Sequence, residues 1–258
     1  MEIYVLASGS KGNLTYLKTK NEAVFIDVGI VYSKIVKKLD EYGEDINNIK
    51  ALFLTHEHGD HVQGLKRLLS KNIIKDVFLT KGTFDCLSDE IVKLLPNYQI
   101  IKADEAFKYK NFEVMPIMLS HDANEPVGYI FNYKKKKVVI ITDTGYVDES
   151  YHDILVDADL YLLEANHHPE KLLKSPRPYL LKQRILGVTG HLSNDDATYL
   201  LNKVIKNKKA IWVAAHISED CNSIYDIEKS IVNNFDDPLK IEVYYSSQES
   251  LPVIKIWK

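Results

Sequence analysis

The chain has 258 residues, 45% of them hydrophobic, and a formal net charge of −3 at pH 7. That apolar content is enough for a sizeable core. A net charge so close to zero does not indicate a general nucleic-acid binder, which would need a local basic surface. The two cysteines, Cys86 and Cys221, lie in unrelated contexts. They exclude a disulfide framework and a CxxC zinc site, and they favour a reducing compartment.

The first residues, MEIYVLASGSKGN, predict a short strand followed by a Gly/Ser turn. They do not have the basic segment and long apolar run of a signal peptide. No apolar run approaches the ~18 residues that span a membrane. We therefore expect a cytoplasmic protein that does not enter a membrane.

Short apolar runs bounded by turn residues predict the strands, and apolar residues at helical spacing predict the helices. The expected strands are 2–7, 14–18, 23–27, 49–55, 76–80, 112–120, 127–133, 137–143, 158–166, 210–216 and 240–247. The expected helices are 31–43, 61–71, 84–95, 178–187, 193–207 and 223–235. Strands and helices are interspersed without a linker or a repeat. This pattern predicts one α/β domain over residues 1–258 with mixed sheets.

The segment HEHGDH holds three histidines and an aspartate within six residues, directly after a buried strand. His56 and His58 alternate in an extended stretch, so we expect them to project to the same side. Asp60 and His61 follow at the start of the next helix, where Gly59 gives the turn its backbone freedom. Imidazoles and a carboxylate at one loop suit zinc, manganese or iron(II). The alternative is an exposed loop that is rich in histidine without binding metal.

Three further polar residues end apolar strands in the way that His56 does: His121, Asp143 and His216. A single polar residue at a strand end is usually a cap or a turn residue. Three with the same placement predict a shared site, because ligands of α/β folds gather where strands end.

With these residues the sequence resembles the metallo-β-lactamase superfamily over nearly its whole length. HEHGDH matches the HxHxDH motif, His121, Asp143 and His216 match the later motifs, and Asp27 in FIDVG matches the aspartate that supports the site. The resemblance implies an αββα sandwich, made of two mixed sheets between helices, with two divalent metal ions. It assigns His56, His58 and His121 to one ion, assigns Asp60, His61 and His216 to the other, and makes Asp143 the bridge.

Several branches of the superfamily fit less well. Enzymes that hydrolyse β-lactams usually lack the bridging aspartate, which is Asp143 here, and flavo-diiron oxidoreductases replace the second histidine, here His58, by glutamate. The interval from Asp143 to His216 is too short for the inserted domain of the β-CASP nucleases. Nor does the chain show the Gly/Pro-rich arm with which tRNA-processing nucleases grip tRNA.

A closer resemblance is to the YycJ/WalJ (VicX-type) subfamily. It rests on the runs LASGSKGN, THEHGDHVQGL, SHDANEPVGY, TDTGYV, LEANHH, LKQRILGVTGHLSNDDA and AAHISEDCNS. The subfamily implies hydrolysis of phosphodiesters by a metal-bridging hydroxide, with DNA as the expected substrate and RNA less favoured. His-rich ligation suits zinc, the same donors accept manganese, and iron stays open. The oligomeric state also stays open, a dimer included.

The resemblance implies three catalytic roles. Asp60 orients or deprotonates the attacking water, unless it is a ligand only. His191 in TGHLSNDD contacts the phosphate and protonates the leaving oxygen, which suits an imidazole. The alternative for His191 is a capping contact at the start of a helix. Glu164 ends an apolar strand and so needs a partner, and we expect it to orient His191.

Substrate contacts are expected from two segments, residues 8–13 and residues 166–184. Ser8, Ser10 and Asn13 lie in a Gly-rich turn whose N–H groups suit a phosphate, although such a turn is often only a hairpin. Asn166 follows Glu164, and of the run Asn166–His168 we expect one residue at the cleft and two on the surface.

The segment 169–184 combines basic residues with an aromatic one, and it suits a nucleic-acid backbone unless it is merely solvated. Its basic residues are Lys171, Lys174, Arg177, Lys182 and Arg184, of which Arg177 and Lys182 are the candidates for substrate contact.

The sequence therefore predicts a metal-dependent phosphodiesterase, most specifically an exonuclease that acts on DNA. One alternative is a hydrolase of a small molecule, such as a cyclic phosphodiester, a thioester or a lactone. Another is a regulatory protein with a vestigial site, which the complete set of ligands disfavours.

Overall fold

The computed structural model describes residues 1–256, which form two compact units. Unit 1 comprises Met1–Pro116, Ala123–Val127 and the C-terminal segment from Ser247, and unit 2 comprises Ile117–Asp122 and Gly128–Ser246. The expectation of a single domain stays a prediction.

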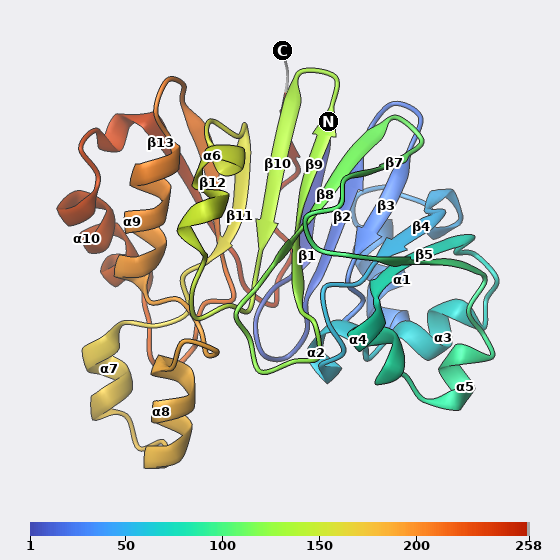
Figure 1. Cartoon of the computed structure of the whole chain (residues 1–258), viewed down its shortest axis with the longest axis horizontal. Coiled ribbons are helices and arrows are strands. Elements are labelled where there is room, and N and C mark those ends of the chain that lie inside the picture. Colours follow the sequence, from blue (N-terminus) through green and yellow to red (C-terminus); the bar gives the residue numbers. More distant parts are fainter. Residues whose placement is uncertain (257–258) are drawn as a thin grey trace. The chain divides into compact units, whose positions relative to one another are not determined.

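The first sheet is mixed and has seven strands in the order β14-β1-β2-β3-β4-β5-β6 (Figure 1). Strands β1, β2 and β3 are antiparallel neighbours, whereas β3, β4, β5 and β6 run parallel. The bounds are β1 Glu2–Ala7, β2 Leu14–Lys18, β3 Ala23–Ile26, β4 Ala51–Phe53, β5 Asp76–Thr80, β6 Asn97–Ile101 and β14 Ile254–Lys255.

The helices of unit 1 are short and amphipathic. They are α1 Tyr32–Asp40, α2 Gly59–Val62, α3 Leu65–Leu69, α4 Lys81–Asp85 and α5 Asp89–Val92. Ile35 and Leu39 of α1 and Leu65 of α3 are fully buried in the same apolar cluster as Leu52 and Val77 of the sheet. Burial of each such side chain contributes roughly 1.5–3 kcal/mol, so this cluster fixes the helices in place.

Two helices that the sequence predicts as continuous are each divided. The expected helix 61–71 is α2 and α3, separated at Gly64, where an added Cβ would lie 2.3 Å from the carbonyl oxygen of Ile30. The expected helix 84–95 is α4 and α5. The first of these begins early because Thr80 caps it through the N–H of Thr83. Local apolar spacing does not reveal such close approaches of the backbone.

The second sheet is also mixed, with seven strands in the order β13-β12-β11-β10-β9-β8-β7. Strands β9 and β10 are antiparallel, and β10, β11, β12 and β13 are successive parallel neighbours. The bounds are β7 Phe107–Tyr109, β8 Phe112–Met118, β9 Val127–Tyr133, β10 Lys136–Ile141, β11 Leu160–Glu164, β12 Ala210–Ala215 and β13 Ile241–Tyr245.

Unit 2 carries its helices in two groups. Helices α9 (Asn194–Val204) and α10 (Ile224–Asn234) lie side by side, and the short α6 (His152–Leu155) packs against α9 (Figure 1). Helices α7 (Pro169–Lys174) and α8 (Tyr179–Leu186) form a separate pair. Two mixed sheets flanked by helices confirm the predicted α/β class. Among residues 1–256, no helix is both long and apolar enough to cross a bilayer.

The parallel strands bring polar residues to common sheet edges. In unit 1, Asp27 follows β3 and His56 lies three residues beyond its neighbour β4. In unit 2, Asp143 lies just beyond β10, Glu164 ends β11 and His216 follows β12. Because parallel neighbours end on the same side, this topology groups the polar residues of each unit.

Candidate metal centre

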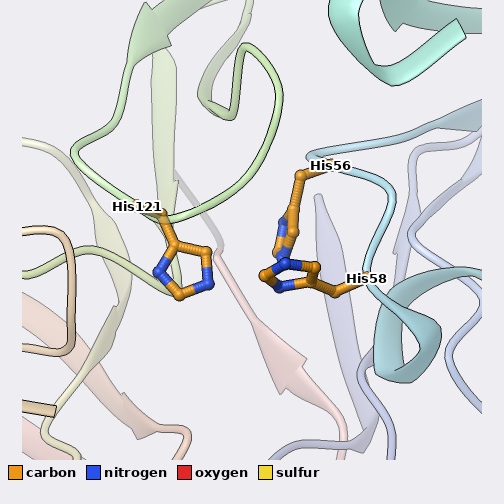
Figure 2. A group of neighbouring side chains, drawn as sticks. All are labelled: His56, His58 and His121. Atoms are coloured by element: carbon orange, nitrogen blue, oxygen red, sulfur yellow. The ribbon is translucent and has the colours of Figure 1, made fainter. Parts of the chain in front are cut away.

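In unit 1 the segment from the end of β4 through α2 gathers three imidazoles, with His56 and His58 in the loop and His61 in the helix. The ring centroids of His56 and His58 lie 4.7 Å apart, and Figure 2 shows both side chains extending from this loop. The rings of His56 and His61 lie closer still, with centroids 4.0 Å apart. Asp60 adds a carboxylate whose Oδ2 is 3.7 Å from Nε2 of His61. The donors predicted from the sequence are therefore close together within this unit.

The buried carboxylate of Asp27 holds this loop in place. Its Oδ1 accepts the N–H of Thr55 at 2.9 Å, and its Oδ2 accepts the Thr55 hydroxyl at 2.9 Å. The same Oδ2 lies 2.7 Å from Nδ1 of His61. A carboxylate can only accept, so Nδ1 of His61 carries the hydrogen and Nε2 carries the lone pair. This is how carboxylates prepare histidines for metal ligation.

The Gly-rich turn after β1 packs against the same loop. The Asn13 side chain accepts the N–H of Gly9 at 2.9 Å, and its Nδ2 lies 3.3 Å from Oδ2 of Asp60. Asn13 and Ser8 are buried, whereas Ser10 is exposed. Asn13 therefore joins two loops of the centre, and its expected contact with substrate stays a prediction, as do those of Ser8 and Ser10.

Gly29 permits this packing. A Cβ on Gly29 would lie 1.6 Å from the carbonyl oxygen of Asp60, while a Cβ on Gly59 would meet nothing within 4 Å. Gly59 has no positive φ either. The expectation that the turn needs Gly59 is wrong, because the close approach occurs at Gly29 on the facing segment.

We expect Gly29→Ala to lower the free energy of unfolding by about 3 kcal/mol, since the β-carbon overlaps the Asp60 carbonyl. Urea titration followed by circular dichroism measures it. The matched control is Gly59→Ala, which we expect to keep or slightly raise stability at the start of α2. Equal stabilities for the two variants would contradict the prediction.

In unit 2 a second cluster combines Asp143, Glu164, His191 and His216. One donor atom from each lies within 4.8 Å of the others. Nδ1 of His216 is 3.1 Å from Oδ1 of Asp143 and 3.3 Å from Oε2 of Glu164. Nδ1 of His191 is 3.1 Å from the same Glu164 oxygen. His121 lies near this cluster, with its ring centroid 5.2 Å from that of His191.

Glu164 connects the members of this cluster. Oε2 faces both histidine Nδ1 atoms, and Oε1 accepts the N–H groups of Thr144 at 2.7 Å and Leu192 at 3.2 Å. Burial by itself would raise the pKa of this carboxyl, but His191 and the other donors lower it to about 2. Glu164 is therefore a buried carboxylate near neutral pH. It has the partner that its position requires, and its role in orienting His191 stays a prediction.

The pKa of His191 shifts in the opposite direction to that of Glu164. Burial by itself would lower the pKa of its imidazole, but the charge and the hydrogen bond of Glu164 outweigh this and raise it to about 9. Nδ1 of this ring is directed at Glu164. The helix cap behind it is Ser193, which forms a capping box with Asp196, so His191 does not cap α9.

Each of four predicted histidine ligands has a partner at Nδ1. In unit 1, Nδ1 of His56 lies 2.9 Å from the Thr55 hydroxyl, and Nδ1 of His61 contacts Asp27. In unit 2, Nδ1 of His121 lies 3.2 Å from the Gly190 carbonyl, and Nδ1 of His216 contacts Asp143 and Glu164. Partners at Nδ1 favour the tautomer whose Nε2 carries the lone pair, and in His61 this Nε2 lies 2.9 Å from Nδ2 of Asn13. The donor set therefore fits divalent metal ions.

Asp27, Asp143 and His216 share an uncommon backbone conformation. Their φ angles are 57°, 60° and 51°, in the left-handed region that residues other than glycine rarely adopt. Each follows a strand end, and each turns its side chain into one of the two clusters. Residues held in this way cost about 1–3 kcal/mol and concentrate at functional sites.

Comparison with known proteins places the chain in a family. A model of the β-lactamase superfamily domain matches residues 32–217. The chain belongs to the metallo-β-lactamase superfamily.

Its relatives include an exodeoxyribonuclease YycJ of Bacillus anthracis, 33% identical over 221 residues, with 84% of this chain and 83% of that protein covered. The exodeoxyribonuclease WalJ of Streptococcus pneumoniae is 32% identical and covers 84% and 82%. These matches confirm the YycJ/WalJ resemblance, and the chain is a hydrolase of this superfamily.

A solved structure supports the fold. The metallo-β-lactamase fold protein YhfI of Bacillus subtilis aligns with a TM-score of 0.74 and 15% identity, covering 98% of this chain and 99% of that one. At this identity the likeness concerns the fold alone.

The expected substrate contacts of the second segment lie in local networks of unit 2. Asn166 donates to the carbonyl of His216 at 2.8 Å. Arg177 lies 3.5 Å from Asp220, and Arg184 pairs with Asp122. Lys182 donates to the carbonyl of Leu173 at 2.6 Å. Lys171 and Lys174 also pair with carboxylates, so Lys182 is the one basic residue of the segment without one among the described residues.

His167 is buried, as is its neighbour Asn166. The exposed fraction of His167 is 1%, and within residues 1–256 neither ring nitrogen has a hydrogen-bond partner. Burial lowers the pKa of its imidazole to about 4. The expectation of two surface residues in 166–168 is wrong, because a bridge between His167 and Ser193 draws this segment inward.

Thr55 and Thr144 were also missed, and their only sequence signal is their place beside His56 and Asp143.

His167→Leu should remove a destabilisation that grows in acid. Between pH 6.5 and about 4 the unfolded chain binds a proton at His167 and the folded chain does not, so the wild type loses stability as pH falls. From pH 6.5 to 4.5 we expect it to lose about 2–3 kcal/mol more than the variant.

Urea titrations of the wild type and His167→Leu across that range measure the difference. At pH 7 the variant should be at least as stable, because the wild type buries two ring nitrogens that have no hydrogen-bond partner among residues 1–256. Parallel losses in the two proteins would contradict the prediction.

Proposed function

We propose that this hydrolase cleaves phosphodiesters with two divalent metal ions, zinc or manganese before iron, and that its substrate is DNA, which it degrades from an end. The observation that carries the proposal is the set of histidines with Nδ1 partners, which presents Nε2 atoms as ligands beside carboxylates. The exodeoxyribonuclease names of two relatives support the choice of substrate.

We assign the ligands as the superfamily resemblance does. His56, His58 and His121 hold one ion, and Asp60, His61 and His216 hold the other, with Asp143 shared. When bound, such a pair of cations lowers the pKa of a water molecule and offsets charge on the phosphoryl group. Asp27 supports His61 through the 2.7 Å contact at Nδ1.

The remaining roles belong to residues of the unit 2 cluster. His191 contacts the phosphate through Nε2 and delivers a proton to the leaving oxygen, because Nδ1 is occupied by Glu164 at 3.1 Å. Glu164 is a positioning residue, since its carboxylate is fully buried. Asp60, whose side chain is 24% exposed, orients the attacking water.

We further propose a cytoplasmic location. Cys86 and Cys221 are both free, as in a reducing compartment.

A substrate panel tests the proposed function. We expect apo protein to bind close to two Mn²⁺ or Zn²⁺ per chain and then to release mononucleotides from labelled single- or double-stranded DNA faster than from RNA of the same sequence. Removal of the metal by a chelator should abolish release. The panel includes bis-p-nitrophenyl phosphate.

Each contrary outcome has a distinct meaning. Cleavage of the small ester alone would favour a small-molecule diesterase, and internal fragments would contradict an exonuclease. Failure to bind metal, or full loading without cleavage of any substrate, would contradict the proposal and favour a vestigial site.

His191→Ala should lower kcat on DNA by about 10²- to 10⁴-fold, because a positioned acid is lost. Metal content, measured by atomic emission, should not change. His168→Ala is the matched control, since His168 lies in the same unit outside the cluster. Unchanged kcat in His191→Ala would remove this residue from the mechanism.

A further inference from the structure

A cavity of about 210 Å³ lies in unit 2 between the segment after Asp143 and helix α9. Val147, Leu192 and Leu200 contribute buried apolar side chains to its lining. Tyr146 and Tyr199 also line it, and their exposed fractions of 46% and 55% place both at the solvent-facing rim.

The walls of this cavity are continuous with the catalytic cluster. Thr144 and Leu192 both donate their N–H groups to Oε1 of Glu164. Thr144 follows Asp143, and its hydroxyl donates to the carbonyl of Tyr146 at 2.6 Å. One buried carboxylate therefore fixes the cluster and two sides of the cavity together.

The segment that carries Tyr146 is also fixed by contacts of its neighbour Gly145 with other parts of unit 2. The N–H of Gly145 donates to the carbonyl of Ser120 at 2.9 Å, and a Cβ on Gly145 would lie 2.4 Å from the carbonyl oxygen of Gly187. The backbone next to Tyr146 is therefore tightly packed on this side of the cavity.

The chemistry of the lining selects the kind of occupant. Glu149 and Asp196 add two exposed carboxylates, which repel a phosphate, and His152 lies beside them in the lining. Oδ2 of Asp196 accepts from Ser193, which leaves its Oδ1 and the carboxylate of Glu149 to accept N–H groups. Apolar and aromatic surfaces suit a flat neutral ring. The volume is below the ~300 Å³ of sites for drug-sized ligands, so it suits one ring system.

We propose that this cavity, here called the base cavity, holds one nucleobase of the DNA strand whose phosphodiester lies at the cluster of Asp143, Glu164, His191 and His216. The base stacks on Tyr146 and Tyr199, and its N–H groups face Glu149 and Asp196. This rests on the proposed function. A base reaches such a cavity only outside a duplex stack, so the strand is bound single-stranded at its end.

The test combines DNA that lacks one base with protein variants that lack the Tyr146 or the Tyr199 ring, and it measures kcat/KM for each combination. A short single strand is prepared with one abasic residue, moved along the positions next to the scissile bond. In the wild type, kcat/KM should fall about 5- to 150-fold for one of these positions, as expected for loss of one stacked base.

In Tyr146→Ala and Tyr199→Ala, kcat/KM on intact DNA should fall by a similar factor, and the abasic residue at that position should then cost little more. Tyr146→Phe and Tyr199→Phe should retain the rates, because the ring is kept. Tyr225→Ala on α10 is the matched control, since Tyr225 is 71% exposed and does not line the cavity. Thermal unfolding of each variant shows whether the fold is retained.

The outcomes separate this inference from the function on which it rests. If metal-loaded wild type cleaves neither DNA nor bis-p-nitrophenyl phosphate, the proposed function fails. Suppose instead that the wild type cleaves DNA. If the folded tyrosine variants then have the same kcat/KM on intact DNA as the wild type, or lose as much kcat/KM as it does at every abasic position, only the base cavity is refuted.

Discussion

The buried carboxylate of Glu164 is the constraint on which unit 2 depends. A buried charge costs several kcal/mol unless donors surround it, and four donors do so here: two imidazole Nδ1 atoms and two backbone N–H groups. Those four donors come from the loops after β10 and β12 and from the entry to α9. The charge therefore determines where Asp143, His191 and the wall of the base cavity lie.

Asp27 has the corresponding role in unit 1. Its two oxygens bind Thr55 and His61, so a residue after β3 fixes the loop after β4. Both carboxylates lie at the ends of parallel strands. In each unit a buried carboxylate needs hydrogen-bond donors, and the neighbouring histidines need a group that fixes their orientation. The contacts between carboxylate and Nδ1 satisfy both requirements.

Sequence patterns located strands best where both faces are buried. Strands β1, β2, β5 and β9 have the predicted bounds, because an uninterrupted apolar run is a local property. The short strands β6, β7 and β14 were missed, since β6 begins with exposed polar residues and β14 has two residues that only pairing with β1 defines. The divided helices depend likewise on close contacts such as that of Gly64 with Ile30.

The sequence by itself determined the metallo-β-lactamase class and the donor types. The spacing of histidines and carboxylates after apolar strands is a local property that can be read directly from the order of residues. Tertiary structure decided which groups contact Nδ1 of His56, His61, His121 and His216, and that Asp27, Asp143 and His216 adopt left-handed backbone. It also decided that His167 is buried with no hydrogen-bond partner among residues 1–256. The physical reason is that tautomer, backbone strain and burial are set by groups such as Glu164 and His216, which lie 52 residues apart in the chain.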